Sequence, residues 1–88
     1  MNAKEIGKRI KELRKAHGLT QAKLAEQAGT TLNHLGKIEV GMKVPSLELF
    51  VELAGCLETT LDYLVLGNNG KNEKNEKNEK NVSKPNKY

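Results

Sequence analysis

The apolar side chains of this chain thin out after Leu66, and this limits what its 88 residues can fold into. Residues 71–81 read KNEKNEKNEKN, a repeat without an apolar side chain, so this segment has nothing to bury in a core. We therefore expect one packed domain over residues 1–67 and a low-complexity, disordered tail over residues 68–88. A domain of this size has room for one small core, and we expect no small-molecule ligand cavity in it.

Apolar residues follow a helical period in this domain. They recur at spacings of three and four along the first segment, at Ile6, Ile10, Leu13 and His17. Four later segments each follow a hydroxyl residue that can cap a helix, namely Thr20, Thr31, Ser46 and Thr60. No window alternates with the period of a strand. The pattern predicts an all-α fold of five helices, with the second over residues 21–28 and the third over residues 32–39.

Charge is distributed unevenly along the chain. Residues 1–43 contain nine lysines and arginines against four glutamates, or +5, whereas residues 44–67 contain four acidic residues and no basic one, or −4. The first helix is predicted to show solvent a basic surface, formed by Lys8, Lys11, Arg14 and Lys15. A domain with a basic front and an acidic back is expected to orient toward a polyanion before contact, which is the electrostatic pattern expected for nucleic-acid binding.

The second and third predicted helices have the spacing of a helix-turn-helix. Leu24 and Leu35 must meet across the angle between the helices, and Ala25 must be small where the third helix crosses closely. Gly29 allows a positive φ in a tight turn, and Ile38 closes the core beneath. This spacing predicts two helices held at the angle that DNA-reading domains use.

Three blocks of sequence resemble one known family in the correct order. GLTQAKLAEQAGTT, LGKIEVG and PSLELFVELAGCLETTLDYL resemble the second helix, the recognition helix, and the fourth and fifth helices of the phage-repressor and Cro type of helix-turn-helix, also called the xenobiotic response element (XRE) family. The likeness spans residues 6–67. It implies a transcriptional regulator, with repression as the expected mode, whose recognition helix over residues 32–39 enters the major groove of double-stranded DNA.

The resemblance also implies which residues contact the DNA backbone. Gln21 matches the family glutamine at the start of the second helix, where side chain and backbone N–H meet a phosphate; a free helix N-terminus favours that contact in any case. Thr31 matches a capping residue that also touches phosphate. Lys43, in the loop after the recognition helix, is a further candidate for a phosphate contact.

Leu32, Asn33 and Lys37 occupy the places that face base edges in the family, with His34 beside them. Asparagine pairs bidentately with adenine, lysine donates to guanine O6 or N7, and leucine packs on a thymine methyl group. We expect Asn33 to contribute most to base recognition.

Three residues depart from the family pattern. Gly36 stands inside the recognition helix where a polar residue is usual, either because it permits a close approach of the protein backbone to DNA or because the sequence has drifted in a helix held by tertiary packing. Val40 replaces a polar or basic residue and so removes one possible phosphate contact. Glu58 replaces a glycine that ends the fourth helix.

The sequence carries no constellation typical of an enzyme or a metal site. Cys56 is the only cysteine, which excludes a disulfide within the chain, and we expect it to be a small core residue. His17 is expected to be partly buried or to pair with the helix dipole, and no spaced pair of ligands accompanies it or His34. Glu39 is expected to be a solvated or helix-bracing carboxylate rather than a general base. We predict no catalytic residue, cofactor or metal.

The alternative to a DNA-binding regulator is an antitoxin-like protein-interaction subunit, in which DNA binding is secondary. Its partner surface would use the acidic residues Glu48, Glu52, Glu58 and Asp62. The polar run of the recognition helix favours DNA binding, since a pure interaction module has no need of it. The N-terminal segment has neither a signal peptide nor a membrane span, so we expect a cytosolic protein.

The expected partners are a palindromic operator and a second copy of the chain. The homodimer is expected to form through the fourth and fifth helices. Because the exposed apolar surface is small, the alternatives are a dimer that is stable alone and one that is stable only on DNA.

Overall fold

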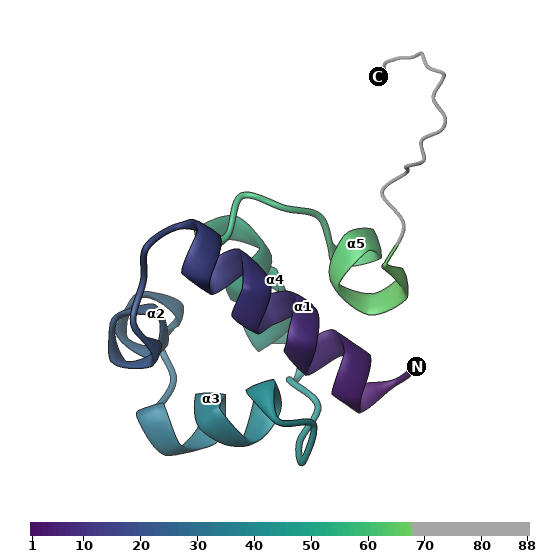
Figure 1. The fold of residues 1–88 in the computed structure, drawn as a ribbon, viewed down its shortest axis with the longest axis horizontal. Coiled ribbons are helices and arrows are strands. Elements are labelled where there is room, and N and C mark those ends of the chain that lie inside the picture. Colours follow the sequence, from purple (N-terminus) through teal and green to yellow (C-terminus); the bar gives the residue numbers. More distant parts are fainter. Residues whose placement is uncertain (68–88) are drawn as a thin grey trace.

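The computed structural model describes residues 1–67, and the predicted tail over residues 68–88 lies outside that range. All regular structure in the described part is helical, which confirms the all-α fold (Figure 1). The elements are α1 (Ala3–Ala16), α2 (Gln21–Ala28), α3 (Leu32–Glu39), α4 (Leu47–Cys56) and α5 (Leu61–Leu66). No helix within residues 1–67 is both long and apolar enough to cross a membrane.

Side-chain caps begin all five helices. Thr20, Thr31, Ser46 and Thr60 each accept a hydrogen bond from the backbone N–H three residues later, at 3.0, 3.1, 3.2 and 3.0 Å, as the sequence predicts. Asn2 caps α1 in the same way at 3.0 Å, so α1 begins before the first apolar residue of its stripe. These local bonds fix the direction in which each helix leaves its loop.

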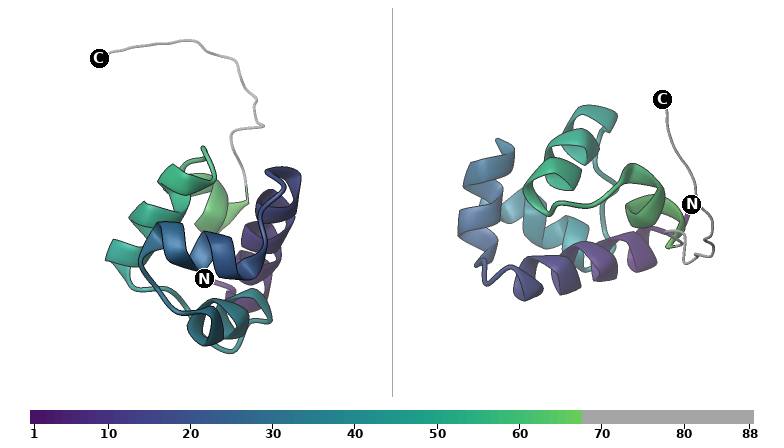
Figure 2. Two further views of the ribbon diagram at one scale, coloured as in Figure 1. Left: turned by 90° about the vertical axis from the view of Figure 1, so that its left-hand side faces the viewer. Right: turned by 90° about the horizontal axis from the view of Figure 1, so that it is seen from above.

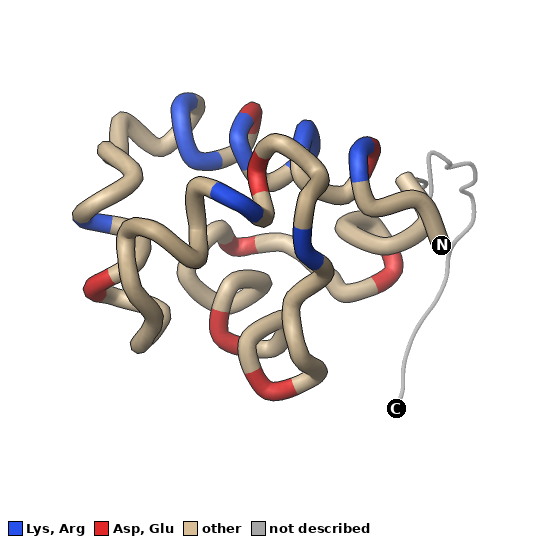
Figure 3. Tube along the Cα trace, turned by 90° about the horizontal axis from the view of Figure 1, so that it is seen from below, with Lys and Arg blue, Asp and Glu red and all other residues tan. Residues whose placement is uncertain are grey.

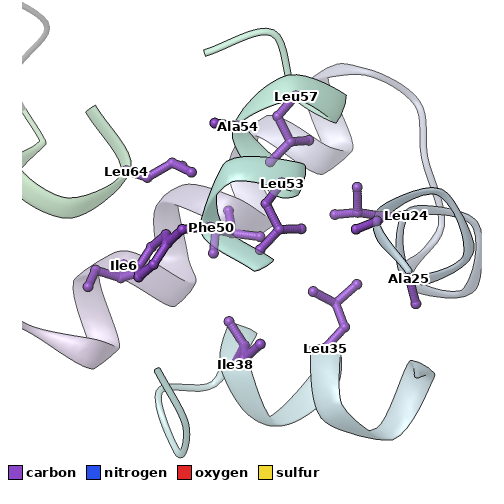
Figure 4. Packing of buried hydrophobic residues seen from close by; sticks show 12 residues of the cluster. Ile6, Leu24, Ala25, Leu35, Ile38, Phe50, Leu53, Ala54, Leu57 and Leu64 are labelled. Carbon is purple, nitrogen blue, oxygen red and sulfur yellow. The ribbon is translucent and has the colours of Figure 1, made fainter. Parts of the chain in front are cut away.

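The five helices enclose one core (Figures 2 and 4). α1 packs against α3 and α5, while α2 packs against α3 and α4. Leucine and isoleucine side chains from every helix fill the centre, and the largest fully buried ones are Ile6, Ile10, Leu24, Leu35, Ile38, Leu53, Leu57 and Leu64. The core thus joins the two helices of the helix-turn-helix to the three others as one unit.

Helix α1 approaches the carboxyl end of α3 through Gly7, which the sequence analysis did not single out. Gly7 is buried, and a β-carbon on it would overlap the carbonyl oxygen of Ile38 and lie 2.6 Å from that of Glu39. Backbone therefore lies directly against backbone at this crossing, and only glycine fits.

An arginine of α1 caps the last helix. Arg9 Nη1 donates to the carbonyl oxygens of Leu64 at 3.0 Å and Val65 at 3.2 Å. Helix ends leave such carbonyl groups without an intrahelical partner, and a cation there complements the helix dipole. The bond ties α5 to α1, which lies beside it (Figure 1).

Glu58 lies just after α4 and occupies the left-handed region with φ 55°. The resemblance described above predicts glycine at this position. A residue with a β-carbon is strained in this region by about 1–2 kcal/mol. We expect Glu58→Gly to raise the free energy of unfolding by about 1 kcal/mol, measured by urea denaturation. Glu58→Ala keeps the backbone strain, so it should not raise the free energy of unfolding. If alanine raised it as much as glycine, loss of the glutamate charge and not relief of strain would be the cause.

Candidate nucleic-acid interface

Helices α2 and α3 pack against each other and are joined by the tight turn that the sequence predicts. Gly29 adopts φ 80° after α2, and the backbone N–H of Thr30 returns to the carbonyl oxygen of Ala25 at 2.9 Å. Leu24 and Leu35 are fully buried where the helices cross, beside Ala25 (Figure 4). The scaffold of a helix-turn-helix is therefore confirmed from the turn to the core contact.

The outer surface of α3 carries three of the four base-contact candidates. Leu32 is 52 % exposed, and Asn33 and Lys37 are exposed beside it. His34 is partly buried and lines a groove between the turn after α2 and the first half of α4. The structure thus brings Leu32, Asn33 and Lys37 onto one surface and turns His34 toward α4.

The phosphate-contact candidates lie around this surface. Thr31 is exposed although its hydroxyl already caps α3, and Lys43 is exposed in the loop that follows α3. Gln21 is partly buried at the start of α2, and its Nε2 donates to Glu39 Oε1 at 2.9 Å. Since a carboxylate only accepts, this bond fixes the amide orientation and leaves one Nε2 hydrogen unused.

A buried ion pair lies behind the surface. Arg14 Nε donates to Glu39 Oε2 at 2.7 Å and Arg14 Nη2 to Oε1 at 3.1 Å, while Nη1 donates to the carbonyl oxygen of Leu19 at 2.8 Å. The side chains are 9 % and 1 % exposed. The bidentate pair holds the carboxyl end of α3 against α1, and through Gln21 it also reaches the start of α2.

This pair corrects the predicted basic surface. Arg14 was expected to face solvent, and that prediction is wrong because its guanidinium group is buried against Glu39. Glu39 braces the helices and is not solvated. Only one local signal pointed to this, since Arg14 follows Ile10 by four residues and so adjoins the apolar stripe of α1.

The remaining charges are separated in space as they are in sequence. Lysine and arginine residues lie along α1, among a few acidic ones, and on α3 and its following loop, whereas the charged residues of α4 and α5 are all acidic (Figure 3). Lys8, Lys11 and Lys15 are exposed on α1, as predicted. A polyanion that approaches α3 therefore meets more positive than negative charge.

Cys56 at the end of α4 and His17 just after α1 both make contacts that support the fold. Cys56 is partly buried against the core, and burial, followed by the charge of Glu52, raises the pKa of its thiol. A raised pKa disfavours the thiolate that a nucleophile or a metal ligand needs. His17 Nε2 lies 2.9 Å from the carbonyl oxygen of Leu57, joining the ends of α1 and α4. Residues 1–67 contain no cluster of three potential metal ligands.

Known proteins are similar to this chain in sequence and in fold. The helix-turn-helix family model matches residues 10–64. The HTH-type transcriptional regulator YazB of Bacillus subtilis is 36 % identical over 64 residues, which cover 73 % of this chain and 93 % of YazB. The cryptic phage CTXphi transcriptional repressor RstR of Vibrio cholerae is 37 % identical over 60 residues, which cover 68 % of this chain and 54 % of RstR.

The fold has close counterparts among solved structures. The P22 c2 repressor in complex with a synthetic operator superposes with a TM-score of 0.70 and 28 % identity, over 72 % of this chain and 96 % of that one. The chain spans 61 % and 51 % of the length of two further Bacillus subtilis regulators that it matches. The chain belongs to the helix-turn-helix family of DNA-binding transcriptional regulators, of the phage-repressor and Cro type.

Proposed function

We propose that this protein binds a specific operator sequence in double-stranded DNA as a transcriptional repressor, with α3 in the major groove. The observation that carries the proposal is the exposed surface of Leu32, Asn33 and Lys37 on a helix whose other side is locked into the core. An α-helix fits the major groove, where base edges present distinct donors and acceptors. The P22 c2 repressor with its operator and SinR with DNA are structural neighbours that support it.

The contacts divide into two groups by chemistry. Asn33 and Lys37 carry the groups that hydrogen-bond adenine and guanine, and they read bases. Lys43, the hydroxyl of Thr31 and the unused Nε2 hydrogen of Gln21 donate to phosphates and fix the register. His34 lies at the edge of this surface and makes a smaller contribution to specificity than Asn33. The domain that carries these contacts is residues 1–67.

We propose that two copies bind a palindromic operator together. An apolar depression of about 250 Å³ lies between the loop before α4 and helix α5, with Leu61 and Val65 on one side. Val44 and Leu47 line it and are 43 % and 71 % exposed, so a second copy would cover them. A surface this small favours a dimer that forms with the help of DNA. We propose that the protein acts in the cytosol, where it would bind such an operator.

A second candidate function rests on the groove beside α4. This groove of about 670 Å³ is lined by Glu48, Glu52, Leu47 and Val51, and no lysine or arginine lines it. An antitoxin-like subunit would bind a partner protein with apolar and basic groups there. The exposed surface of α3 favours DNA binding as the main activity, because a partner in this groove would not need it.

Selection of bound sequences from a random duplex pool tests the proposed function. We expect a two-fold palindrome with half-sites about one helical turn apart, because each copy would place one α3 in the major groove on the same side of the duplex. No enrichment of any sequence would contradict DNA reading, and a single unpaired half-site would contradict the dimer.

Asn33→Ala tests the assignment of base contacts. We expect it to lower affinity for the selected operator by about 5- to 100-fold, the worth of a bidentate contact, with little change for a scrambled duplex. Binding is measured by fluorescence anisotropy at one fixed salt concentration, since phosphate contacts make affinity salt-dependent. Gln27→Ala, an exposed change on α2, is the matched control. Equal operator affinity in wild type and Asn33→Ala would refute the assignment.

A further inference from the structure

Gly36 leaves a gap on the outer surface of α3. A β-carbon built on Gly36 would meet only Gln21 Oε1, at 4.0 Å, which is an ordinary contact. Leu32 lies one helical turn earlier on the same side and is half-exposed. Unlike Gly7, Gly36 is not required by packing, and unlike Gly41 it does not have a positive φ. The fold alone gives no reason for a glycine that weakens its helix.

The walls of this gap have defined chemistry. Gln21 Nε2 is bound to Glu39, so Gln21 presents its Oε1 toward position 36. Oxygen lone pairs there repel a phosphate oxygen, which is also only an acceptor. Apart from the two chain neighbours, no other side chain lies within 4 Å of that β-carbon position, and the half-exposed Leu32 lies one helical turn away. The gap therefore suits a small apolar group better than a phosphate.

We propose that this gap receives the 5-methyl group of a thymine, and that Gly36 determines specificity for that base; the proposal rests on the proposed reading of DNA by α3. Thymine alone among the four bases carries a methyl group on its major-groove edge. Leu32 covers the methyl group from one side, and the missing side chain at position 36 lets the base edge come close to the helix. Both the absent side chain and the exposed leucine then serve one contact.

The first test is Gly36→Ala, for which folding and binding should change in opposite directions. Alanine favours the helix, so we expect the melting temperature to rise by about 3–6 °C. It fills the gap, so we expect affinity for the selected operator to fall by at least about fourfold, the worth of one buried methyl group. Affinity for a scrambled duplex should not change.

Gly55→Ala is the matched control, because a β-carbon at that exposed position in α4 meets nothing within 4 Å. It should leave operator affinity unchanged. A Gly36→Ala protein that is more stable and binds the operator as tightly as wild type would overturn the proposal. It would favour the alternative that glycine arose at this position by sequence drift.

The second test removes the methyl group from the DNA. Replacing each operator thymine in turn by deoxyuridine keeps the base pair and deletes only the methyl group. At one thymine of each half-site we expect about a fourfold loss for wild type. We expect no further loss at that site for Gly36→Ala or Leu32→Ala.

The outcomes separate this inference from the proposed function. Absence of any selected operator would refute the proposed function itself. A selected operator that loses affinity with Asn33→Ala, yet tolerates deoxyuridine at every thymine, would refute the methyl contact and leave DNA reading intact. A loss at a thymine that persists unchanged in both Gly36→Ala and Leu32→Ala would place the methyl contact elsewhere and overturn the role of the gap.

Discussion

Gly7→Ala is expected to lower the free energy of unfolding by about 3 kcal/mol or more, enough to unfold much of a small domain. The added β-carbon would overlap the Ile38 carbonyl oxygen, and neither backbone can yield without moving α1 away from α3. Helix propensity alone predicts the opposite sign, because alanine stabilises a helix by about 1 kcal/mol relative to glycine. The sign of the change therefore reports the close approach of the two helices.

Urea denaturation followed by circular dichroism measures this effect. Gly55→Ala is the same substitution in a helix with open space around it, and it should be neutral or slightly stabilising. If Gly7→Ala proved as stable as Gly55→Ala, the backbone contact between α1 and α3 would be wrong.

Glu39→Ala is expected to lower the free energy of unfolding by about 3–5 kcal/mol. It leaves the Arg14 guanidinium buried without its carboxylate partner, and it also removes the acceptor of the Gln21 amide. The cost comes mainly from the uncompensated charge, so Arg14→Met with Glu39→Leu should recover most of the lost stability. The same denaturation measurement serves for all three proteins.

An exposed ion pair provides the control for this prediction. Lys23 Nζ lies 3.6 Å from Glu26 on the surface of α2, with both side chains more than half-exposed. Glu26→Ala should change the free energy of unfolding by no more than about 1 kcal/mol. If the Arg14–Glu39 double variant were as unstable as Glu39→Ala, the cost would not come from the uncompensated charge, and the hydrogen bonds of the pair would themselves supply the stability.

The helices of the helix-turn-helix were predictable because their ends are set locally. Thr20 and Thr31 each bond to an amide three residues away, and Gly29 supplies the left-handed turn between them. Such signals lie within one turn of chain, so the sequence alone predicts residues 21–28 and 32–39 as the helices that the structure contains.

The contacts of α1 could not be predicted in the same way. Arg14 pairs with a residue 25 positions later, and Gly7 is needed only because α3 passes over it. An arginine beside an apolar stripe is usually solvated, and a glycine in a helix usually signals only weakness. The partly buried position of His34 likewise depends on α4, which lies across the groove. Each of these follows from tertiary packing that no local spacing contains.

The bond from Arg9 to the end of α5 has a consequence for synthesis of the protein. α1 leaves the ribosome first, yet the carbonyl groups that Arg9 binds, at Leu64 and Val65, are made 55 and 56 residues later. Until then the apolar stripe of α1 lacks one of the helices that cover it, and α1, against which α3 packs, is not yet held by α5. The nascent chain should therefore gain the proposed DNA-binding surface in one late step, when α5 emerges, and an incomplete chain should not bind DNA through it.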